Sequence, residues 1–266
     1  MTVLTRIAPP LLSSRRAGRL VERNILNYRR NWLVLLSGFF EPVFYLFGIG
    51  YGIGSLVPSV IGADGRAISY GLFVAPALLA SSAMNGAIYD STFNVFFKLR
   101  YAKTYDAVLA TPLGVGDIAL GEIIWALIRG TLYSLGFVIV MVAFGLVASP
   151  WALLTLPAAM LIGFAFAAVG MAATTFMREW TDFDYITMVT LPLFLFSATF
   201  YPITAYPEAL QTIVRLTPLY QGVELLRSLT TGAVGPWIVG NVVYLVVMGL
   251  IGLTIASKRL DKLLLK

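Results

Sequence analysis

Residues 98–122 read KLRYAKTYDAVLATPLGVGDIALGE and separate two long apolar blocks of the chain. Tyr101, Tyr105 and Val108 recur at helical spacing, which predicts one face of a short helix at about 101–111. Pro112 is expected to end this helix, because the residue before a proline is disfavoured in the α region. A helix of this length cannot cross a bilayer, which takes about 20 residues. It therefore lies outside the membrane, either as an ordinary loop or as a contact for a partner.

The glycines after this helix predict a break before the next one. Gly114 and Gly116 are expected to loosen the chain, and Asp117 is placed to act as the N-cap of a new helix. The quoted stretch thus joins two membrane spans through one short helix and a turn.

The composition indicates a polytopic helical membrane protein. Hydrophobic residues make up 59% of the 266, and charged residues only 12%, about half of the ~25% usual in soluble domains. The absence of cysteine and histidine excludes disulfides, thiol catalysis, imidazole metal sites and Ser-His hydrolysis. No G-x-x-x-x-G-K-[ST] phosphate loop occurs, so ATP is not bound by that route. We predict no catalytic residue, no metal site and no nucleic-acid partner.

The apolar blocks predict an all-α fold with six spans. Their expected limits are Trp32–Leu56, Tyr70–Val95, Ile118–Val147, Trp151–Met177, Tyr185–Tyr201 and Trp237–Ser257. Residues 1–31 are then a tail with an interfacial helix, 32–257 the membrane domain, and 258–266 a basic tail.

The distribution of lysine and arginine predicts the orientation. If the N-terminus is cytoplasmic, 15 of the 19 cations fall in cytoplasmic segments, as the positive-inside rule requires. Both termini and the 98–122 stretch are therefore expected in the cytoplasm. Within the N-terminal segment, residues 15–32 predict a helix lying in the membrane interface, and a solvated basic tail is the alternative. Its apolar face is expected to carry Ala17, Val21, Ile25, Tyr28 and Trp32, and the opposite face Arg15, Arg16, Arg19, Arg23 and Arg30.

The segment at about 202–232 predicts two short helices on the outer side. Pro207 is expected to open the first, which runs to about Leu216, and Pro218 opens the second, which Gly232 ends. The hairpin either re-enters the membrane against protein or a cavity, or lies flat on the outer surface. Its candidate residues are Pro202, Pro207, Pro218, Tyr220, Gln221, Glu224 and Arg227.

Ionisable residues within the predicted spans form another group. Glu41, Asp90, Glu122 and Arg129 fall within apolar blocks. An intramembrane charge costs on the order of 3 kcal/mol, so it faces protein or water. Ion pairing between spans is the simplest expectation, and Glu41 can pair with Arg129; a route for substrate is the alternative.

Three regions carry a resemblance to a known family. They are Glu41-Pro42, the segment YDAVLATPL at 105–113, and the late segments FSATFYP at 196–202 and PLYQGVELLR at 218–227. The chain resembles the permeases of type-2 ATP-binding-cassette exporters, in the branch of the lipo-oligosaccharide and daunorubicin export permeases. Many of those relatives carry histidine where this chain has Gln221, so no substrate is inferred from that position.

The resemblance implies an interfacial elbow helix, six spans, a coupling helix between spans two and three, and a re-entrant outer hairpin before the sixth. It implies two permease chains and two ATPase chains, with ATP and Mg on the ATPases, in the inner membrane of a bacterium. The implied cargo is an amphiphile: a lipid-linked glycan, a lipid or a hydrophobic drug. The residues expected to contact the ATPase are Tyr101, Tyr105, Asp106, Val108, Leu109 and Pro112. A secondary carrier or channel, and a lipid-modifying membrane enzyme, remain the alternatives.

Overall fold

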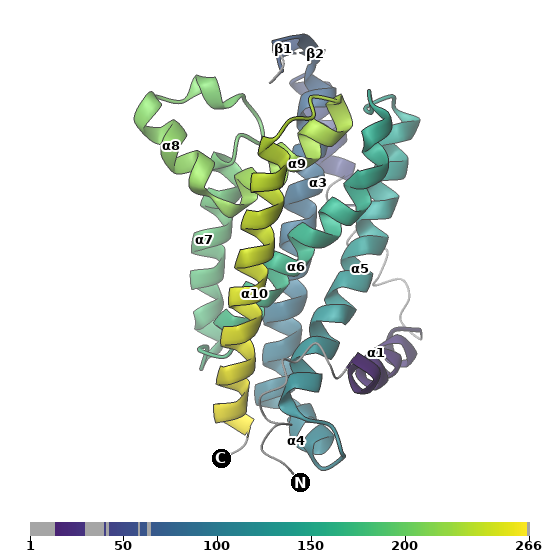
Figure 1. Cartoon of the computed structure of the whole chain (residues 1–266), viewed down its shortest axis with the longest axis vertical. Coiled ribbons are helices and arrows are strands. Elements are labelled where there is room, and N and C mark those ends of the chain that lie inside the picture. Colours follow the sequence, from purple (N-terminus) through teal and green to yellow (C-terminus); the bar gives the residue numbers. More distant parts are fainter. Residues whose placement is uncertain (1–13, 30–39, 41–42, 58, 63–64, 265–266) are drawn as a thin grey trace.

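The computed structural model of the chain describes residues 14–29, 40, 43–57, 59–62 and 65–264. Long helices run side by side in one bundle (Figure 1). Within these residues, four helices are long and apolar enough to cross a membrane: Tyr70–Tyr101, Val115–Ala143, Pro150–Thr174 and Trp237–Leu264. The all-α membrane class is therefore confirmed.

These four helices correspond to the second, third, fourth and sixth predicted spans. The helix of the second predicted span begins as α3 (Tyr70–Tyr89) and continues through two π-helical segments, Asp90–Asn94 and Phe97–Tyr101. α5 is Val115–Ala143. A 3₁₀ turn, Pro150–Leu154, precedes α6 (Thr155–Thr174).

The last helix, α10, spans Trp237–Leu264. It therefore continues through most of the segment that the sequence predicts as a separate basic tail.

The other two predicted spans differ from these. Much of the first, Trp32–Leu56, falls outside the described residues, and its described part includes a π-helical segment, Leu46–Tyr51. In the fifth, α7 (Phe183–Phe196) has 14 residues, about 21 Å at 1.5 Å per residue, against a hydrocarbon core of about 30 Å. The six-span topology stays a prediction.

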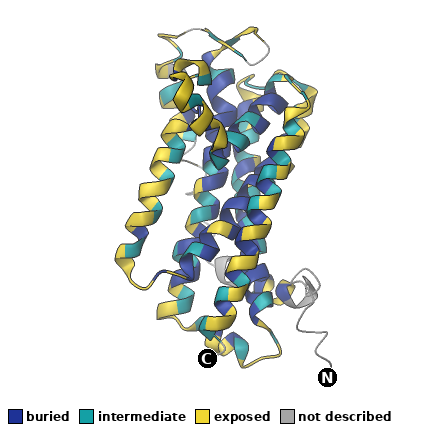
Figure 2. Ribbon diagram, turned by 60° about the vertical axis from the view of Figure 1, so that its left-hand side comes forward, coloured by how far each residue is buried: buried dark blue, intermediate teal, exposed yellow. Residues whose placement is uncertain are grey.

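α6 is the centre of the bundle and packs against α3, α5, α10 and α9 (Pro218–Thr231). Small residues allow the close approach, as is common between helices in membranes. At Gly252 of α10, an added Cβ would lie 2.7 Å from the backbone nitrogen of Val169. Figure 2 shows the buried centre of the bundle and the more exposed outer helices.

The two ends of the bundle carry different elements. α1 (Ser14–Arg29), α4 (Thr104–Leu109) and the end of α10 lie at one end (Figure 1). At the other end lie α8, α9 and a β-hairpin that the sequence did not predict. Its strands, β1 (Ser59–Ile61) and β2 (Ala67–Ser69), pair antiparallel.

The outer helices have the limits that proline and glycine predict. α8 is Glu208–Leu216, with Pro207 at its N-cap. α9 is Pro218–Thr231 and ends at Gly232, whose φ of 85° is left-handed. The two predicted helices and their limits are confirmed.

The helix α1 buries one face against the rest of the chain. Ala17, Leu20, Val21 and Asn24 are buried, whereas Ile25 is 48% exposed. The placement of Ile25 on an apolar face toward the membrane interface stays a prediction. α1 itself packs on protein. It sits so close to α5 that a Cβ at Gly121 would lie 3.0 Å from the Cβ of Leu20.

Candidate functional site

A cavity of about 610 Å³ opens between α3, the π-helical segment after it, α5 and α7. Its apolar part is aromatic and includes Tyr45, Tyr89, Phe93 and Phe194. Its polar part consists of Ser81, Ser82, Asn85, Asp90, Arg129, Tyr133, Thr187 and Thr190. This mixture suits a molecule with both an apolar and a polar portion.

Helical spacing brings these side chains to one place. Ser82, Asn85 and Tyr89 are three and four residues apart on α3, and Arg129 and Tyr133 are four apart on α5. Residues at these separations share a helix face. One face each of α3, α5 and α7 therefore contributes side chains to the cavity.

Asp90 and Arg129 form a buried ion pair in the wall of the cavity. Nη1 of Arg129 lies 2.6 Å from Oδ1 of Asp90, and both side chains are at most 8% exposed. Nη2 of Arg129 donates to the hydroxyl of Tyr133 at 3.0 Å. Arg129 is thus an interior charge, as predicted, and its partner is Asp90. Among the described residues that line the cavity, these two formal charges are opposite and the other polar groups are uncharged.

Asp90 belongs to the π-helical segment Asp90–Asn94. A side chain of α6 donates a hydrogen bond to the backbone of this segment. Such segments are rare and often mark functional positions. The hydroxyl of Thr174 donates to the carbonyl of Ser91 at 2.9 Å. A Cβ at Gly170 would overlap the Ser91 side chain, so glycine permits this contact between helices.

Aromatic rings join the cavity to the end of the bundle that carries α4. Phe93, a cavity residue, stacks on Phe183 with ring centroids 4.0 Å apart and on Tyr89 at 4.8 Å. The ring of Trp180 lies 5.1 Å from that of Phe183. The ring of Tyr101 lies 6.4 Å from that of Trp180. The rings therefore form a continuous series from the cavity to Tyr101, just before α4.

The predicted coupling helix is shorter than expected, and it packs Tyr105 and Val108 against the bundle. α4 has six residues, and Lys103 just before it is left-handed, with φ of 46°. Tyr101 therefore belongs to the preceding π-helical segment and is 60% exposed. Tyr105 is 1% exposed, so the expectation that its ring offers an outward contact is wrong.

The outward face of α4 is made of other residues. Val108 is buried and Leu109 half-buried, whereas Pro112 is exposed. The exposed side of this segment consists of Asp106, Ala107, Ala110, Thr111 and Pro112.

The start of α5 differs from the prediction in one respect. The N-cap is Gly114, and the Oδ2 of Asp117, three residues later, accepts from the Gly114 backbone N–H at 2.9 Å. Asp117 is thus at the third helical position rather than the N-cap, where a carboxylate reaches back to the first free N–H. Gly116 lies inside the helix and does not loosen the chain.

Glu122 has a cation partner of its own. Nζ of Lys98 lies 2.7 Å from Oε2 and 2.9 Å from Oε1 of Glu122. Asn24 of α1 donates to Glu122 and accepts from Lys98, both at 3.4 Å. Glu122 and Arg129 therefore pair with different residues. Glu41, the other charge predicted within a span, lies outside the described residues, as does its predicted pairing with Arg129.

On the outer side, Arg227 joins α9 to two other segments. Its Nη2 donates to the Ala198 carbonyl at 2.8 Å and its Nε to the Phe73 carbonyl at 3.2 Å. The guanidinium also lies 3.8 Å from the centre of the Phe73 ring. Arg227 therefore links α9 to α3 and to the segment that follows α7.

The remaining residues of the outer hairpin have structural positions. Pro202 precedes a 3₁₀ turn, Ile203–Ala205, and Pro218 occupies the first turn of α9. Gln221 donates from its amide to the Arg215 carbonyl at 2.5 Å, which satisfies the end of α8. Tyr220 is half-buried.

Several cavity residues were missed from the sequence. Asn85, Tyr133, Thr187 and Thr190 are isolated polar residues within apolar runs, and each recurs four residues from another cavity residue. This spacing was the available signal. Among the described residues, no group of three or more Asp or Glu side chains could hold a metal ion.

Comparison with known proteins gives one family. The model of the ABC-2 type transporter family matches residues 16–230. Nodulation protein J of Rhizobium leguminosarum bv. trifolii is 34% identical over 212 residues, which are 79% of each chain.

Two further relatives carry the same name. Nodulation protein J of Rhizobium meliloti is 31% identical over 215 residues, 77% of this chain and 80% of that protein. The Azorhizobium caulinodans protein is 25% identical over 246 residues, 90% and 95% of the two chains. The chain thus belongs to the ABC-2 type transporter family, as a membrane permease.

Proposed function

We propose that this permease exports an amphiphile whose polar part is uncharged, with energy from a separate ATPase chain. The cavity carries this proposal, because aromatic rings and neutral hydrogen-bonding groups line it together. Its two charges are paired at 2.6 Å, and a neutral wall favours hydroxyl and amide groups over a phosphate or carboxylate. Phosphate-free lipid-linked glycans, neutral lipids and uncharged hydrophobic drugs fall in this class.

The exposed side of α4 is the proposed contact for the ATPase. Asp106, Ala107 and Ala110 are exposed there, and Asp106 offers a charge to a basic residue of the partner. Tyr105 and Val108 hold the helix on the bundle from its buried side. ATP and Mg would bind to the ATPase, of which two copies are expected.

The topology proposed for the complex has six spans with both termini in the cytoplasm of a bacterium. α1, α4 and the end of α10 share one end of the bundle (Figure 1). The cations Arg19, Lys98, Lys103, Lys258 and Lys262 gather at the same end, which supports a cytoplasmic position. The hairpin 202–232 then lies on the outer side of the membrane.

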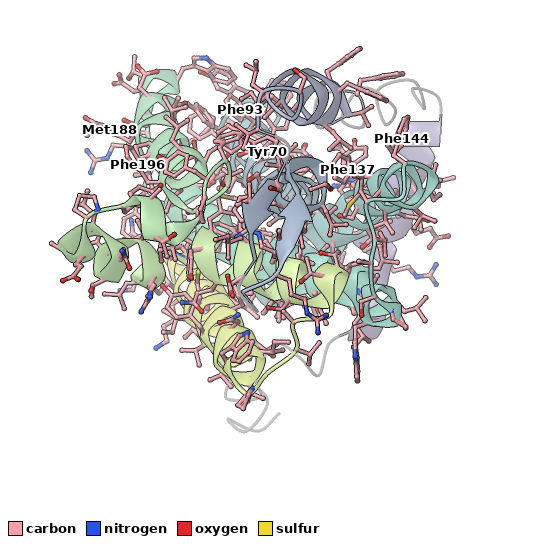
Figure 3. All side chains as sticks on the ribbon, turned by 90° about the horizontal axis from the view of Figure 1, so that it is seen from above. Tyr70, Phe93, Phe137, Phe144, Met188 and Phe196 are labelled. Carbon is pink, nitrogen blue, oxygen red and sulfur yellow. The ribbon has the colours of Figure 1, made fainter. Side chains whose placement is uncertain are left out.

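A second permease chain is proposed beside α7. Of this helix only Phe183 is buried, and Met188 and Val189 are 73% and 60% exposed. Figure 3 shows Met188 and Phe196 at the outer edge of the bundle. Two copies facing each other through α7 would enclose the cavity from the side.

A cavity-filling variant tests the route. Thr190→Trp places an indole in the cavity and is expected to lower export of a neutral glycolipid at least about tenfold, while ATPase binding stays intact. Val243→Trp is the control, because Val243 is 53% exposed on α10, away from the cavity residues. Normal export by a well-folded Thr190→Trp variant would show that the cavity is not the route.

A further inference from the structure

A buried turn follows α7 and leads into the outer hairpin. Its residues Ser197, Ala198 and Thr199 are each at most 1% exposed. Ala198 has φ of 54°, in the left-handed region. An alanine there carries a steric cost that a glycine does not, because its Cβ approaches the neighbouring backbone. We refer to residues 197–200 as the hinge turn.

Side chains from α3 and α9 hold the hinge turn in this conformation. Nη2 of Arg227 donates to the Ala198 carbonyl at 2.8 Å, and Nε of the same guanidinium donates to the Phe73 carbonyl at 3.2 Å. The hydroxyl of Tyr70 donates to the Phe200 carbonyl at 3.0 Å. These contacts stabilise a backbone conformation that alanine alone disfavours.

α7, which precedes the hinge turn, is held mainly at its two ends. Near its start Phe183 stacks on Phe93 with ring centroids 4.0 Å apart, and near its end Phe194 meets Phe200 at 5.1 Å. Between these points α7 lines the cavity. Pro192 lies within the helix, so one backbone hydrogen bond is missing there. A helix fastened in this way can move as a unit once one end is released.

We propose that α7 swings away from α3 when Ala198 leaves its left-handed conformation and its carbonyl separates from Arg227, and that this swing sets the rate at which cargo passes the cavity. A few residues at the end of an element commonly absorb such a change in φ and ψ. Ala198 and Arg227 are positioning residues: they act on α7 and do not line the cavity. The passage of cargo rests on the proposed function, whereas the swing is a property of the chain itself.

One substitution separates this role from a purely structural one. Ala198→Gly keeps the turn and removes its steric cost, so the thermal stability of the permease should rise. Because the closed turn is then favoured, export should fall about fivefold, the factor that the strain of one left-handed residue implies. If the turn were only structural, a more stable turn would not slow export.

A buried thiol measures the opening of the hinge turn. Ser197→Cys places the thiol at a position that is 0% exposed, in a chain without other cysteines, so a water-soluble maleimide reacts only when the turn opens. The complex with its ATPase is reconstituted in vesicles of phosphatidylethanolamine and phosphatidylglycerol. Adding Ala198→Gly to this variant should slow labelling about fivefold. Adding Arg227→Lys should speed it at least about fivefold, since a lysine has no planar fork to reach both carbonyls.

Ala209→Gly is the matched control, because it makes the same change at an exposed helical position of α8. It should leave both the labelling of Ser197→Cys and export unchanged. Unchanged labelling after Ala198→Gly would overturn the swing, and slower labelling with unchanged export would overturn its role in transport; both leave the exporter intact. If Arg227→Lys fails to fold, Ala198→Gly alone decides.

The proposed function has a separate outcome in this experiment. If the unmodified chain binds no ATPase, the exporter is refuted. Labelling of Ser197→Cys in the permease without a partner would then still decide whether the hinge turn opens.

Discussion

At the scale of single residues, two ion pairs link segments of the apolar bundle. Arg129 pairs with Asp90, and Lys98 pairs with Glu122. Arg227 is instead satisfied by two backbone carbonyls. Each of these arrangements fixes the distance between segments far apart in the sequence.

Removal of one charge from the cavity wall should destabilise the fold. Arg129→Met leaves Asp90 buried without its cation, and we expect a loss of about 3–5 kcal/mol in unfolding free energy. The double variant Asp90→Asn with Arg129→Gln should recover much of it. Thermal unfolding in detergent measures both, and equal stability of the single and double variants would contradict the pairing.

On the outer side, Arg227→Met tests the attachment of α9. The substitution removes the donors to Ala198 and Phe73 and the cation above the Phe73 ring. We expect proteolysis after residue 198 to become faster, because the segment 197–217 loses its tether. Glu224→Gln, the neighbouring polar change, should leave the rate unchanged; if both variants behave like the parent, Arg227 is not the tether.

At the scale of elements, the spacing of α6 and α10 depends on glycine. Gly252→Ala would place a methyl group against the backbone of Ala168 and Val169, which should cost about 1–3 kcal/mol. Gly240→Ala on the same helix has no atom within 4 Å of the added methyl. The Gly240 variant should be at least as stable as the parent in the same unfolding assay. Similar stabilities for both variants would show that the two helices can separate freely.

The coupling role of α4 is tested by reversing one exposed charge. Asp106→Arg should lower the amount of ATPase that co-purifies with the permease by at least about tenfold, since a rim charge opposite a basic partner becomes repulsive. Glu208→Arg makes the same change on the outer side and should have no effect. Full ATPase recovery with Asp106→Arg would move the contact away from α4.

The limits of helices bounded by proline and glycine were predictable from the sequence. The side that a helix buries was not, because it depends on how neighbouring helices pack. Pro207, Pro218 and Gly232 fixed α8 and α9 because they act locally on the backbone. Tyr105 was expected to face outward, but the left-handed Lys103 turns α4 against the bundle. The cavity needs stripes from three helices, and no local pattern reveals which stripes will face one another.

At the scale of the whole molecule, the two ends of the bundle should lie in different compartments. Single cysteines at Gly62 and Ala209 should react with an impermeant maleimide added outside intact cells, and cysteines at Ala102 and Lys262 should react only after the membrane is opened. The cysteine-free parent is the blank. Reaction of Ala102→Cys in intact cells would reverse the orientation.

The central claim is that this permease works with a separate ATPase, and co-purification tests it most directly. The tagged, otherwise unmodified chain is extracted from its own membrane without crosslinking, and the co-eluting chains are identified by mass spectrometry. We predict a phosphate-loop ATPase in an amount comparable to the permease, with ATP hydrolysis in the same fractions. A permease that elutes with no ATPase and no hydrolysis would contradict the account.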